Sequence, residues 1–428
     1  MIRKIFIVLF LSFTCIVFGQ RATSSPYSYF GIGDEFSART VEQNAMGGIG
    51  VAFSHYKYLN FTNPAAYSDL RFTTYSLGAL NNDLKLKTGR TSQSSTSTNL
   101  SYVALAFPIG SKAGFSLGLQ PLSSVGYSLT NFERDDNSNV LEATFFEGNG
   151  GVNRLFGAFG IKVIKNLSLG IEADFSFGSV ENRITSQRAN VALLTRYEEN
   201  TTIRGGSVKL GAQYQKELKN DLFINAGTTF KFSNDLNVTG TDRLYTLAVS
   251  QFGEEERDIG SSTPINGTFN LPLKSTFGIG VGKLDKWYVG AEYETQDAFS
   301  TTGLLATTTG SYRYDDSNRI SIGGYYLPKI NSISSYWDRI TYRAGVRIEK
   351  TGLLADGSGA NTNFTEINDF GISFGLGLPL KRLSTVNLGF EFGKRGTTEN
   401  NLIEENYFNL RLSLSLTDVN WFVKRKID

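Results

Sequence analysis

Residues 167–177 read Leu-Ser-Leu-Gly-Ile-Glu-Ala-Asp-Phe-Ser-Phe, and this stretch decides the fold class of the chain. Every odd-numbered position is apolar, whereas the even-numbered positions carry Ser, Gly, Glu, Asp and Ser. Successive side chains of a β-strand point to opposite faces, so the pattern predicts a strand with one apolar and one polar face. The same alternation recurs in residues 222–233, 370–378 and 408–416.

Such alternating segments recur along most of the chain and are joined by connections of alternating length. Short turns lie near residues 110–112, 165–166, 219–220, 284–285 and 381–383, and longer polar segments fill the other gaps: 82–97, 132–149, 181–204, 237–268, 298–317, 351–365 and 397–404. The expected strands are fourteen: 70–81, 98–108, 112–131, 150–164, 167–180, 205–218, 220–236, 269–284, 286–297, 318–328, 338–350, 366–380, 384–396 and 405–417. Outer-membrane barrels combine an even strand number with short periplasmic turns and longer external loops. The sequence therefore predicts an all-β protein, a transmembrane antiparallel up-and-down β-barrel with both termini in the periplasm.

The composition of the 428-residue chain fits this prediction. Gly is abundant at 45 residues, Tyr and Phe number 20 and 32, and only 19% of the residues are charged. Strands that alternate lipid-facing apolar and lumen-facing polar residues give such a balance. The formal net charge of +2 and the lack of a basic stripe give no reason to expect a nucleic-acid partner.

The chain divides into four expected segments. Residues 1–19 have a basic start and an apolar run, which predicts a cleaved signal peptide. Residues 20–69 are too irregular for spanning strands, residues 70–417 form the expected barrel, and residues 418–428 form a periplasmic tail. The only cysteine, Cys15, lies in the first segment and in a poor lipidation context, so the mature chain is expected to contain no disulfide or thiolate metal site.

Two motifs in the second segment point to a family. Residues 44–52 read Asn-Ala-Met-Gly-Gly-Ile-Gly-Val-Ala, and residues 63–66 read Asn-Pro-Ala-Ala. With the strand count, they resemble the FadL/TodX (OmpP1-type) family of outer-membrane transporters for hydrophobic compounds, and residues 25–33 and 392–396 look like a Bacteroidota branch of it. The resemblance implies an N-terminal hatch that plugs the barrel. Its expected hatch residues are Asn44, Gly47, Gly48, Gly50, Asn63, Pro64 and Ala65. The alternative is an ordinary periplasmic N-terminal arm.

Glycine has a physical use in such a hatch. A backbone that threads a crowded lumen needs close approach and positive φ, which Gly47, Gly48 and Gly50 allow. A phosphate-binding loop is excluded as an explanation because no βαβ unit surrounds them. Gly278 and Gly280 alternate with apolar residues on an expected strand, so they are interpreted as lumen-facing.

Gln120 and Pro121 interrupt the third expected strand. Proline cannot donate to a β-ladder, so it marks a bend or a local break in a closed barrel. In FadL-like proteins a kink in the third strand opens a lateral gap, and the resemblance therefore implies a lateral portal here. A harmless bulge is the alternative.

Catalysis has little support, because the single histidine, His55, lies away from the strands and no nucleophile–base pair is evident. No cofactor or metal is expected, and loop carboxylates at residues 254–256 are interpreted as solvated charge. Several charged residues of both signs are expected to face the lumen, which favours a filled barrel over an open porin: Glu172, Asp174, Lys209, Lys231, Arg343, Arg347, Glu349, Glu391 and Arg411.

The function expected from the resemblance is passive uptake of small hydrophobic compounds through a plugged lumen and a lateral portal. The alternative is an adaptor or accessory barrel in a secretion or barrel-assembly complex, since relatives of this family serve in such machines. A general porin is the third reading. The expected surroundings are outer-membrane lipid and lipopolysaccharide, with hydrophobic small molecules or another outer-membrane barrel as partners.

Overall fold

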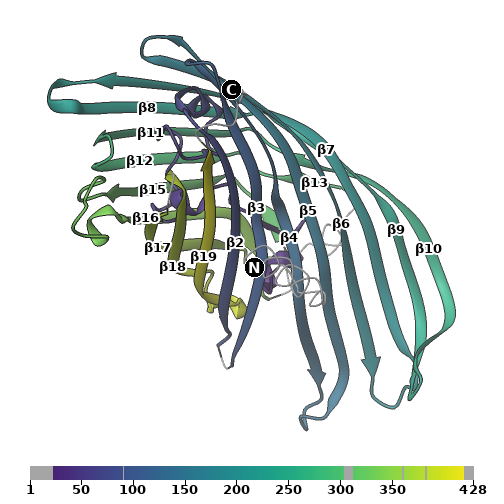
Figure 1. Cartoon of the computed structure of the whole chain (residues 1–428). Coiled ribbons are helices and arrows are strands. Elements are labelled where there is room, and N and C mark those ends of the chain that lie inside the picture. Colours follow the sequence, from purple (N-terminus) through teal and green to yellow (C-terminus); the bar gives the residue numbers. More distant parts are fainter. Residues whose placement is uncertain (1–22, 90, 303–311, 359–360, 381–382, 419–428) are drawn as a thin grey trace, which may run out of the picture.

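The computed structural model describes residues 23–89, 91–302, 312–358, 361–380 and 383–418. The expected signal peptide, Cys15 and nearly all of the expected C-terminal tail lie outside these residues. Fourteen spans form one closed antiparallel barrel (Figure 1). They are β2 (Thr73–Lys87), β3 (Ser92–Ile109), β4 (Ala113–Arg134), β5 (Val140–Ile164), β6 (Leu167–Arg188), β7 (Leu194–Glu217), β8 (Leu222–Lys231) with β9 (Asn234–Ser250), β10 (Gly253–Leu271) with β11 (Lys274–Lys283), β12 (Trp287–Gln296), β15 (Ser317–Tyr326), β16 (Thr341–Ala355), β17 (Thr365–Pro379), β18 (Thr385–Arg395) and β19 (Glu404–Asp418).

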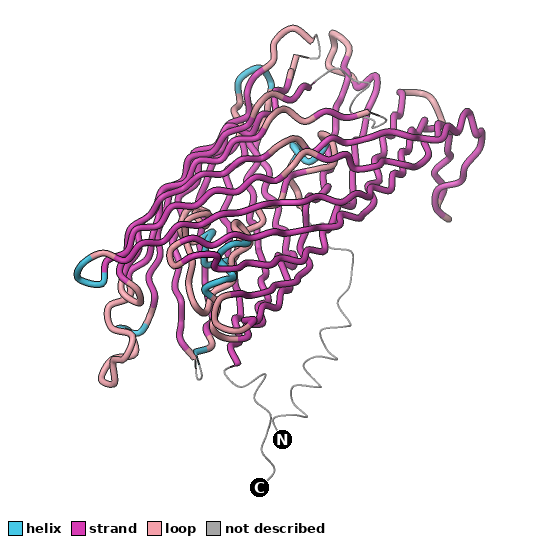
Figure 2. Tube along the Cα trace, turned by 90° about the horizontal axis from the view of Figure 1, so that it is seen from above, coloured by secondary structure: helices cyan, strands magenta, loops and turns pink. Residues whose placement is uncertain are grey.

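The barrel closes where the last strand pairs with the first. The β19–β2 ladder runs from Asp418 opposite Thr73 to Glu404 opposite Lys87, so neither strand leaves a free edge there. The remaining strands are short: β1 (Asp34–Glu35), β13 (Ser300–Thr301) and β14 (Tyr312–Tyr314). Figure 2 shows the spans crossing the molecule obliquely, with loops gathered at its two ends. The predicted fold class and strand number are confirmed.

The outward face of the spans carries an apolar band. On β6, Leu169, Ile171, Phe175 and Phe177 are exposed, whereas the intervening polar side chains are buried or half-buried inside. The same pattern gives the exposed Phe277, Ile279 and Val281 on β11 and many others around the circumference. A closed barrel with such a band is built to stand in hydrocarbon, because its strands pair with neighbours around the whole circumference.

Four of the expected long loops are wrong, because the strands continue through them. For example, β6 and β7 stay paired up to Ser186 opposite Thr195, and β9 and β10 up to Ser250 opposite Gly253. Outside the lipid both faces of a strand can be polar, so these segments lack the alternation of apolar and polar residues by which a span is recognised in the sequence. The continuations lie on one side of the barrel, in β2–β7, β9 and β10, which Figure 1 shows as long strands beyond the shorter β12–β19 side.

The helical elements are short. They are η1 (Pro26–Tyr29), α2 (Val41–Asn44), η2 (Pro64–Asp69), η3 (Lys219–Asp221), η5 (Trp337–Arg339) and η7 (Glu399–Asn401). No helix in the described part of the chain has the length and apolar character needed to cross a membrane.

The apolar band predicts where a charge is costly. Ile279→Arg places a cation in the middle of the band on β11 and is expected to destabilise the folded barrel by about 2–4 kcal/mol. Thr239→Arg, on the outward face of the β9 continuation, should change stability by less than about 1 kcal/mol. Urea-dependent folding into phosphatidylcholine vesicles measures both, and equal costs would contradict the assignment of the band.

Candidate functional site: the N-terminal segment and the β3–β4 seam

The N-terminal segment, residues 23–72, packs against the inner wall of the barrel through its backbone. A methyl group on Gly160 of β5 would lie 2.3 Å from the Pro64 carbonyl oxygen, and one on Gly323 of β15 would lie 2.1 Å from that of Met46. Ten strands each contribute one inward glycine to such contacts: Gly114, Gly160, Gly170, Gly211, Gly227, Gly278, Gly323, Gly345, Gly375 and Gly389. We call this set the glycine belt.

The glycine belt meets the N-terminal segment in strand order. Tyr67 lies at the glycine of β4, Val51 at those of β8 and β11, and Val41 at that of β18. Between them β12 contributes a carboxylate, since Glu292 Oε2 accepts the backbone N–H groups of Gly50 and Val51 at 2.7 and 2.8 Å. Residues 41–67 therefore follow the inner wall around most of its circumference.

The predicted hatch residues take part in this packing to different degrees. Gly47 and Gly48 have φ of +71° and +86°, as expected for positions that only glycine adopts easily. Gly50 has no positive φ; its need for glycine is space, because a methyl group there would lie 2.2 Å from Gln43 Nε2. Asn44 has a lesser role, with one side-chain hydrogen bond of 3.4 Å to the carbonyl of Arg39.

The Asn63-Pro64-Ala65 motif begins η2 and attaches it to the wall. The Asn63 side chain accepts a hydrogen bond from the Ala65 N–H at 3.0 Å and so caps the helix. Its Nδ2 donates to the carbonyls of Val51 and of Ala212 on β7. Pro64 occupies the first position of the turn, where its missing N–H costs nothing.

Sequence reasoning missed the buried side chains that brace the segment internally. Thr40 and Gln43 form a capping box at α2, and Gln43 Nε2 also donates to Asn60 Oδ1 at 3.0 Å. The Asn60 side chain in turn donates to the carbonyls of Gly50 and Phe53. A Thr-x-x-Gln spacing just before the glycine motif was the available signal.

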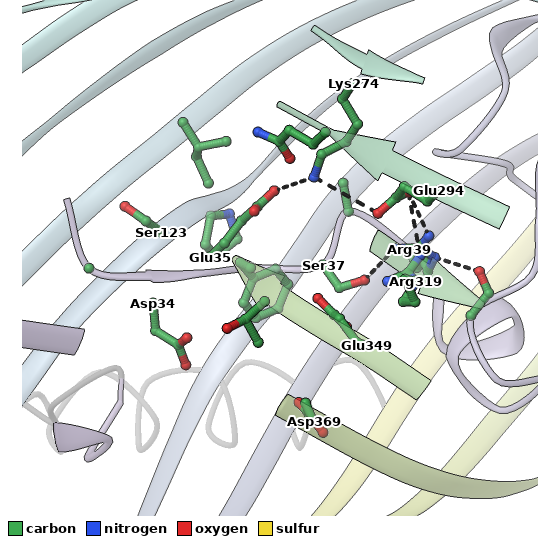
Figure 3. A pocket seen from close by; sticks show the side chains of 18 of the residues that line it. Asp34, Glu35, Ser37, Arg39, Ser123, Lys274, Glu294, Arg319, Glu349 and Asp369 are labelled. Atoms are coloured by element: carbon green, nitrogen blue, oxygen red, sulfur yellow. Dashed lines mark hydrogen bonds and ion pairs between the residues drawn. The ribbon is translucent and has the colours of Figure 1, made fainter. Parts of the chain in front are cut away.

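Ion pairs fasten the segment to distant parts of the wall (Figure 3). Arg39 Nη2 lies 3.1 Å from both Glu292 Oε1 and Glu294 Oε2 on β12, and Glu35 Oε1 lies 2.6 Å from Lys274 Nζ on β11. On the opposite side, Asp34 Oδ1 lies 2.6 Å from Arg395 Nη1 on β18. The Arg39–Glu292 pair is buried, and because buried charges are costly to leave unpaired it holds the segment in one position. The side chains of Glu35 and Asp34 are 50% and 28% exposed, so their ion pairs contribute less.

The predicted lumen-facing charges do lie inside the barrel, and all of them except Arg343, which donates to Asn387 Oδ1, belong to two wall clusters. One joins Arg154 to Glu172 and Asp174 at 3.1 and 3.4 Å, with Lys209 and Lys231 on the same carboxylates. The other is centred on Arg347 and Glu391 and contains these residues: Arg347, Glu349, Asp369, Glu391, Tyr407, Asn409 and Arg411.

The ladder between β3 and β4 stops half-way. It pairs Ile109 with Ala113 through to Val103 with Leu119, and no further pair joins the two strands among the described residues. Yet β3 continues along β2 to Ser92, and β4 continues along β5 to Arg134. The break comes immediately before Gln120 and Pro121. We call the unpaired stretch the β3–β4 seam.

Pro121 also marks a bulge against β5, where the register shifts between Pro121 and Ser123. The edge of β4 that β3 leaves is taken up by the N-terminal segment. Asp34 and Glu35 of β1 pair with Ser124 and Ser123, and the Phe36 N–H donates to the Leu122 carbonyl at 2.8 Å. The segment thus substitutes for β3 along part of the seam.

An apolar inner surface begins at the seam. Leu122, Val125 and Tyr127 of β4 pack with inward side chains of β5–β7, β9 and β10 and with Ile32 of the segment. The inner-belt residues are Ile32, Leu122, Val125, Tyr127, Val152, Val180, Ile203, Leu236, Val238, Ile265, Phe269 and Leu271. Beside it lies a cavity of about 360 Å³ that reaches Pro121. Its lining combines apolar side chains, among them Ile32, Leu122, Phe269 and Leu271 of the inner belt, with the ion-paired side chains of Figure 3 and members of the two wall clusters.

His55 lies at the end of the barrel that carries the short turns, with Nε2 3.4 Å from Asp285 Oδ1 in the β11–β12 turn. Burial lowers the pKa of His55 to about 4, although the carboxylate of Asp285 opposes this shift. The histidine is thus neutral and structural, with no nucleophile beside it. Within the described part of the chain, no group of His, Cys, Asp and Glu side chains is arranged to hold a metal.

The glycine belt yields a matched pair of variants on β5. Gly160→Val should displace the N-terminal segment and destabilise the barrel by about 1–3 kcal/mol, the usual cost of overpacking. Gly157→Val should be tolerated, because a methyl group there has its nearest neighbour 3.8 Å away. Limited proteolysis of the N-terminal segment and urea unfolding measure the difference, and equal protease resistance of the two variants would contradict the packing.

The buried histidine yields a pH dependence. A pKa of about 6.5 in the unfolded chain against about 4 in the folded one means that the unfolded state binds more protons between these values. The contribution of His55 to stability is therefore complete above about pH 6.5 and is lost as the pH falls toward 4. His55→Gln should flatten the stability profile in this window relative to the unmodified protein, and superimposable profile shapes would refute the assignment.

Comparisons with known proteins agree on the architecture. The fold is similar to that of the Pseudomonas putida toluene transporter TodX, with 16% identity, a TM-score of 0.58 and coverage of 90% of this chain and 99% of that chain. It is also similar to the Ralstonia pickettii toluene transporter TbuX, with 14% identity, a TM-score of 0.57 and coverage of 89% and 99%. The fold is also similar to that of a Pseudomonas aeruginosa FadL homologue, with 14% identity, a TM-score of 0.58 and coverage of 90% of this chain and 98% of that chain. At these identities the likeness shows a shared fold.

The comparison with curated proteins found no match. The BamG family model, in contrast, matches the whole chain, residues 1–428. The FadL-like resemblance therefore holds for the architecture, and by sequence the chain belongs to the BamG family.

Proposed function

We propose that the chain is an outer-membrane barrel through which small hydrophobic molecules pass sideways, by way of the β3–β4 seam. The observation that carries this proposal is the interrupted ladder: β3 and β4 separate at Val103 and Leu119, although both continue beside other partners. Unpaired backbone at membrane depth is costly, so a barrel keeps such a break only where something else covers it or passes through it.

The surroundings of the seam support this route. The inner-belt residues line the inner wall with apolar side chains from the strand continuations down to Leu122, and β1 closes the β4 edge with only two ladder pairs. Displacing β1 would join the inner belt to the lipid side. The structurally similar TodX and TbuX are toluene transporters by title, which gives a first class of compound to test.

In this proposal the N-terminal segment acts as the hatch, with Gln120 and Pro121 as the corner of the portal. The short turns face the periplasm, both termini lie there, and residues 1–19 are removed on export. Energy comes from partitioning down a concentration gradient, so no cofactor takes part.

A cross-link between β1 and β4 tests the proposal. Glu35 and Ser123 are register partners, so Glu35→Cys with Ser123→Cys, in a Cys15→Ser background, should form a disulfide that fixes β1 in the seam. Uptake of radiolabelled toluene by cells should fall to the level of cells without the protein, and return on reduction.

The matched control is Thr239→Cys with Asn266→Cys, register partners in the β9–β10 continuation far from the seam. This pair should cross-link without changing uptake. If the Glu35–Ser123 disulfide forms quantitatively and uptake is unaltered, lateral passage through the seam is refuted.

A second candidate is an accessory barrel that serves a larger outer-membrane assembly. The ion pairs that tie the N-terminal segment to β11, β12 and β18 favour it, because they keep the lumen filled. The strand continuations on one side of the barrel also favour an accessory role, because they offer a large surface outside the lipid band. Purification of the native protein in a mild detergent distinguishes the two candidates. Stoichiometric co-purification with another outer-membrane protein supports an accessory role, and purification without any such partner speaks against it.

A further inference from the structure

The end of the barrel with the short turns repeats one chemical arrangement. A large aliphatic side chain stands exposed at the end of a strand, and a lysine follows directly or within three residues. The exposed fractions are 62% for Ile164, 42% for Leu218 and 50% for Leu284, and the lysines are Lys165, Lys219 and Lys286. Ile109 with Lys112 repeats the arrangement. We call these turns, together with residues 327–340, the short-turn rim.

The lysines of this rim are free to bind a ligand. Among the described residues, Lys165, Lys219 and Lys286 are exposed and take part in no ion pair. Two neighbouring carboxylates are occupied elsewhere: Asp285 faces His55 and Tyr56, and Asp221 lies 2.8 Å from Lys283. Glu217, near Lys219, is exposed and forms no ion pair with it. Three lysines at the opposite end differ, since Lys87 and Lys394 both pair with Glu404, and Lys350 pairs with Glu366. Lys85 at that end is exposed and takes part in no ion pair within the described part of the chain, so the contrast holds for the other three.

The longest connection of the rim, between β15 and β16, presents apolar side chains on a firmly braced loop. Ile333 is fully exposed, and Trp337 and Tyr336 are 68% and 42% exposed. The loop is held by the Lys329 N–H donating to the Asp338 carbonyl at 2.8 Å, and by the Tyr336 hydroxyl donating to the Pro379 carbonyl at 3.3 Å on β17. The exposure of these side chains is thus built into the loop.

We propose that the short-turn rim binds the headgroups of anionic glycerophospholipids in the leaflet that it faces. The rim continues the lipid-facing band without a break, because Ile161 and Val163 lead directly to Ile164 on the outward face of β5. Aromatic and aliphatic side chains at this level sit at the hydrocarbon boundary, and lysines beside them reach the phosphates. The rim therefore selects anionic over zwitterionic lipid and fixes the depth of the barrel. This inference needs only the membrane-spanning barrel, whatever the lumen conducts.

Tryptophan fluorescence tests the proposal on the full chain. The chain has three tryptophans, so Trp287→Phe with Trp421→Phe leaves Trp337 as the only reporter. The protein is reconstituted in bilayers containing phosphatidylglycerol or phosphatidylcholine brominated near the headgroup. Trp337 should be quenched by both, with a relative association constant about fivefold in favour of phosphatidylglycerol, the effect of one lysine near a charged surface.

Two triple variants, each of which removes three positive charges, complete the test. Lys165→Gln, Lys219→Gln and Lys286→Gln together should bring the preference close to one. Lys87→Gln, Lys350→Gln and Lys394→Gln together should leave it unchanged, because those lysines are already paired. The proposal is overturned if shallow bromines do not quench Trp337, which would mean that water, protein or a second copy covers the loop. Equal quenching by the two lipids, or equal loss in both triple variants, would also overturn it.

Discussion

Every backbone N–H and C=O group of this barrel that meets hydrocarbon has to be paired within the protein, and most of the architecture follows from that requirement. It explains why the last strand returns to the first along the whole of β2. It also makes the β3–β4 seam the most informative place in the molecule. There the requirement is met only in part: β1 of the N-terminal segment takes the β4 edge at Ser123 and Ser124, whereas the facing edge of β3 pairs with no strand among the described residues.

The wall and the N-terminal segment specify each other. Ten strands carry an inward glycine against the segment, and at six of them a methyl group would lie within 2.4 Å of the segment's backbone: Gly114, Gly160, Gly170, Gly227, Gly323 and Gly345. In return the segment covers buried carboxylates of the wall, as when Gly50 and Val51 donate to Glu292. Backbone contacts of this kind fix the position of the segment without depending on the identity of its side chains.

The sequence predicted the barrel well because lipid imposes a strict period of two on each span. The fourteen predicted spans all exist, and Gly278 and Gly280 do face inward. The period disappears outside the lipid, which is why 181–204 and 237–268 looked like loops. The site was predicted less completely. Asn63 and the positive-φ glycines followed from local chemistry, whereas the roles of Gln43, Asn60 and Glu292 depend on contacts between residues distant in sequence.

The electrostatics of β1 bear on both candidate functions. Its two acidic side chains form ion pairs with different parts of the wall: Asp34 with Arg395 on β18, and Glu35 with Lys274 on β11. The strand is therefore held by these two ion pairs and by only two ladder pairs to β4. Releasing β1 means separating two ion pairs whose carboxylates are partly open to water, since the side chains of Asp34 and Glu35 are 28% and 50% exposed. Ion pairs of this kind contribute little to stability, so water can replace them when a hydrophobic compound displaces β1 along Leu122 and Val125. Arg39 differs, because its ion pair with Glu292 is almost fully buried and ties the rest of the segment to β12. Movement of the whole segment would therefore need a partner that supplies charge of its own, whereas a passive channel needs only β1 to move.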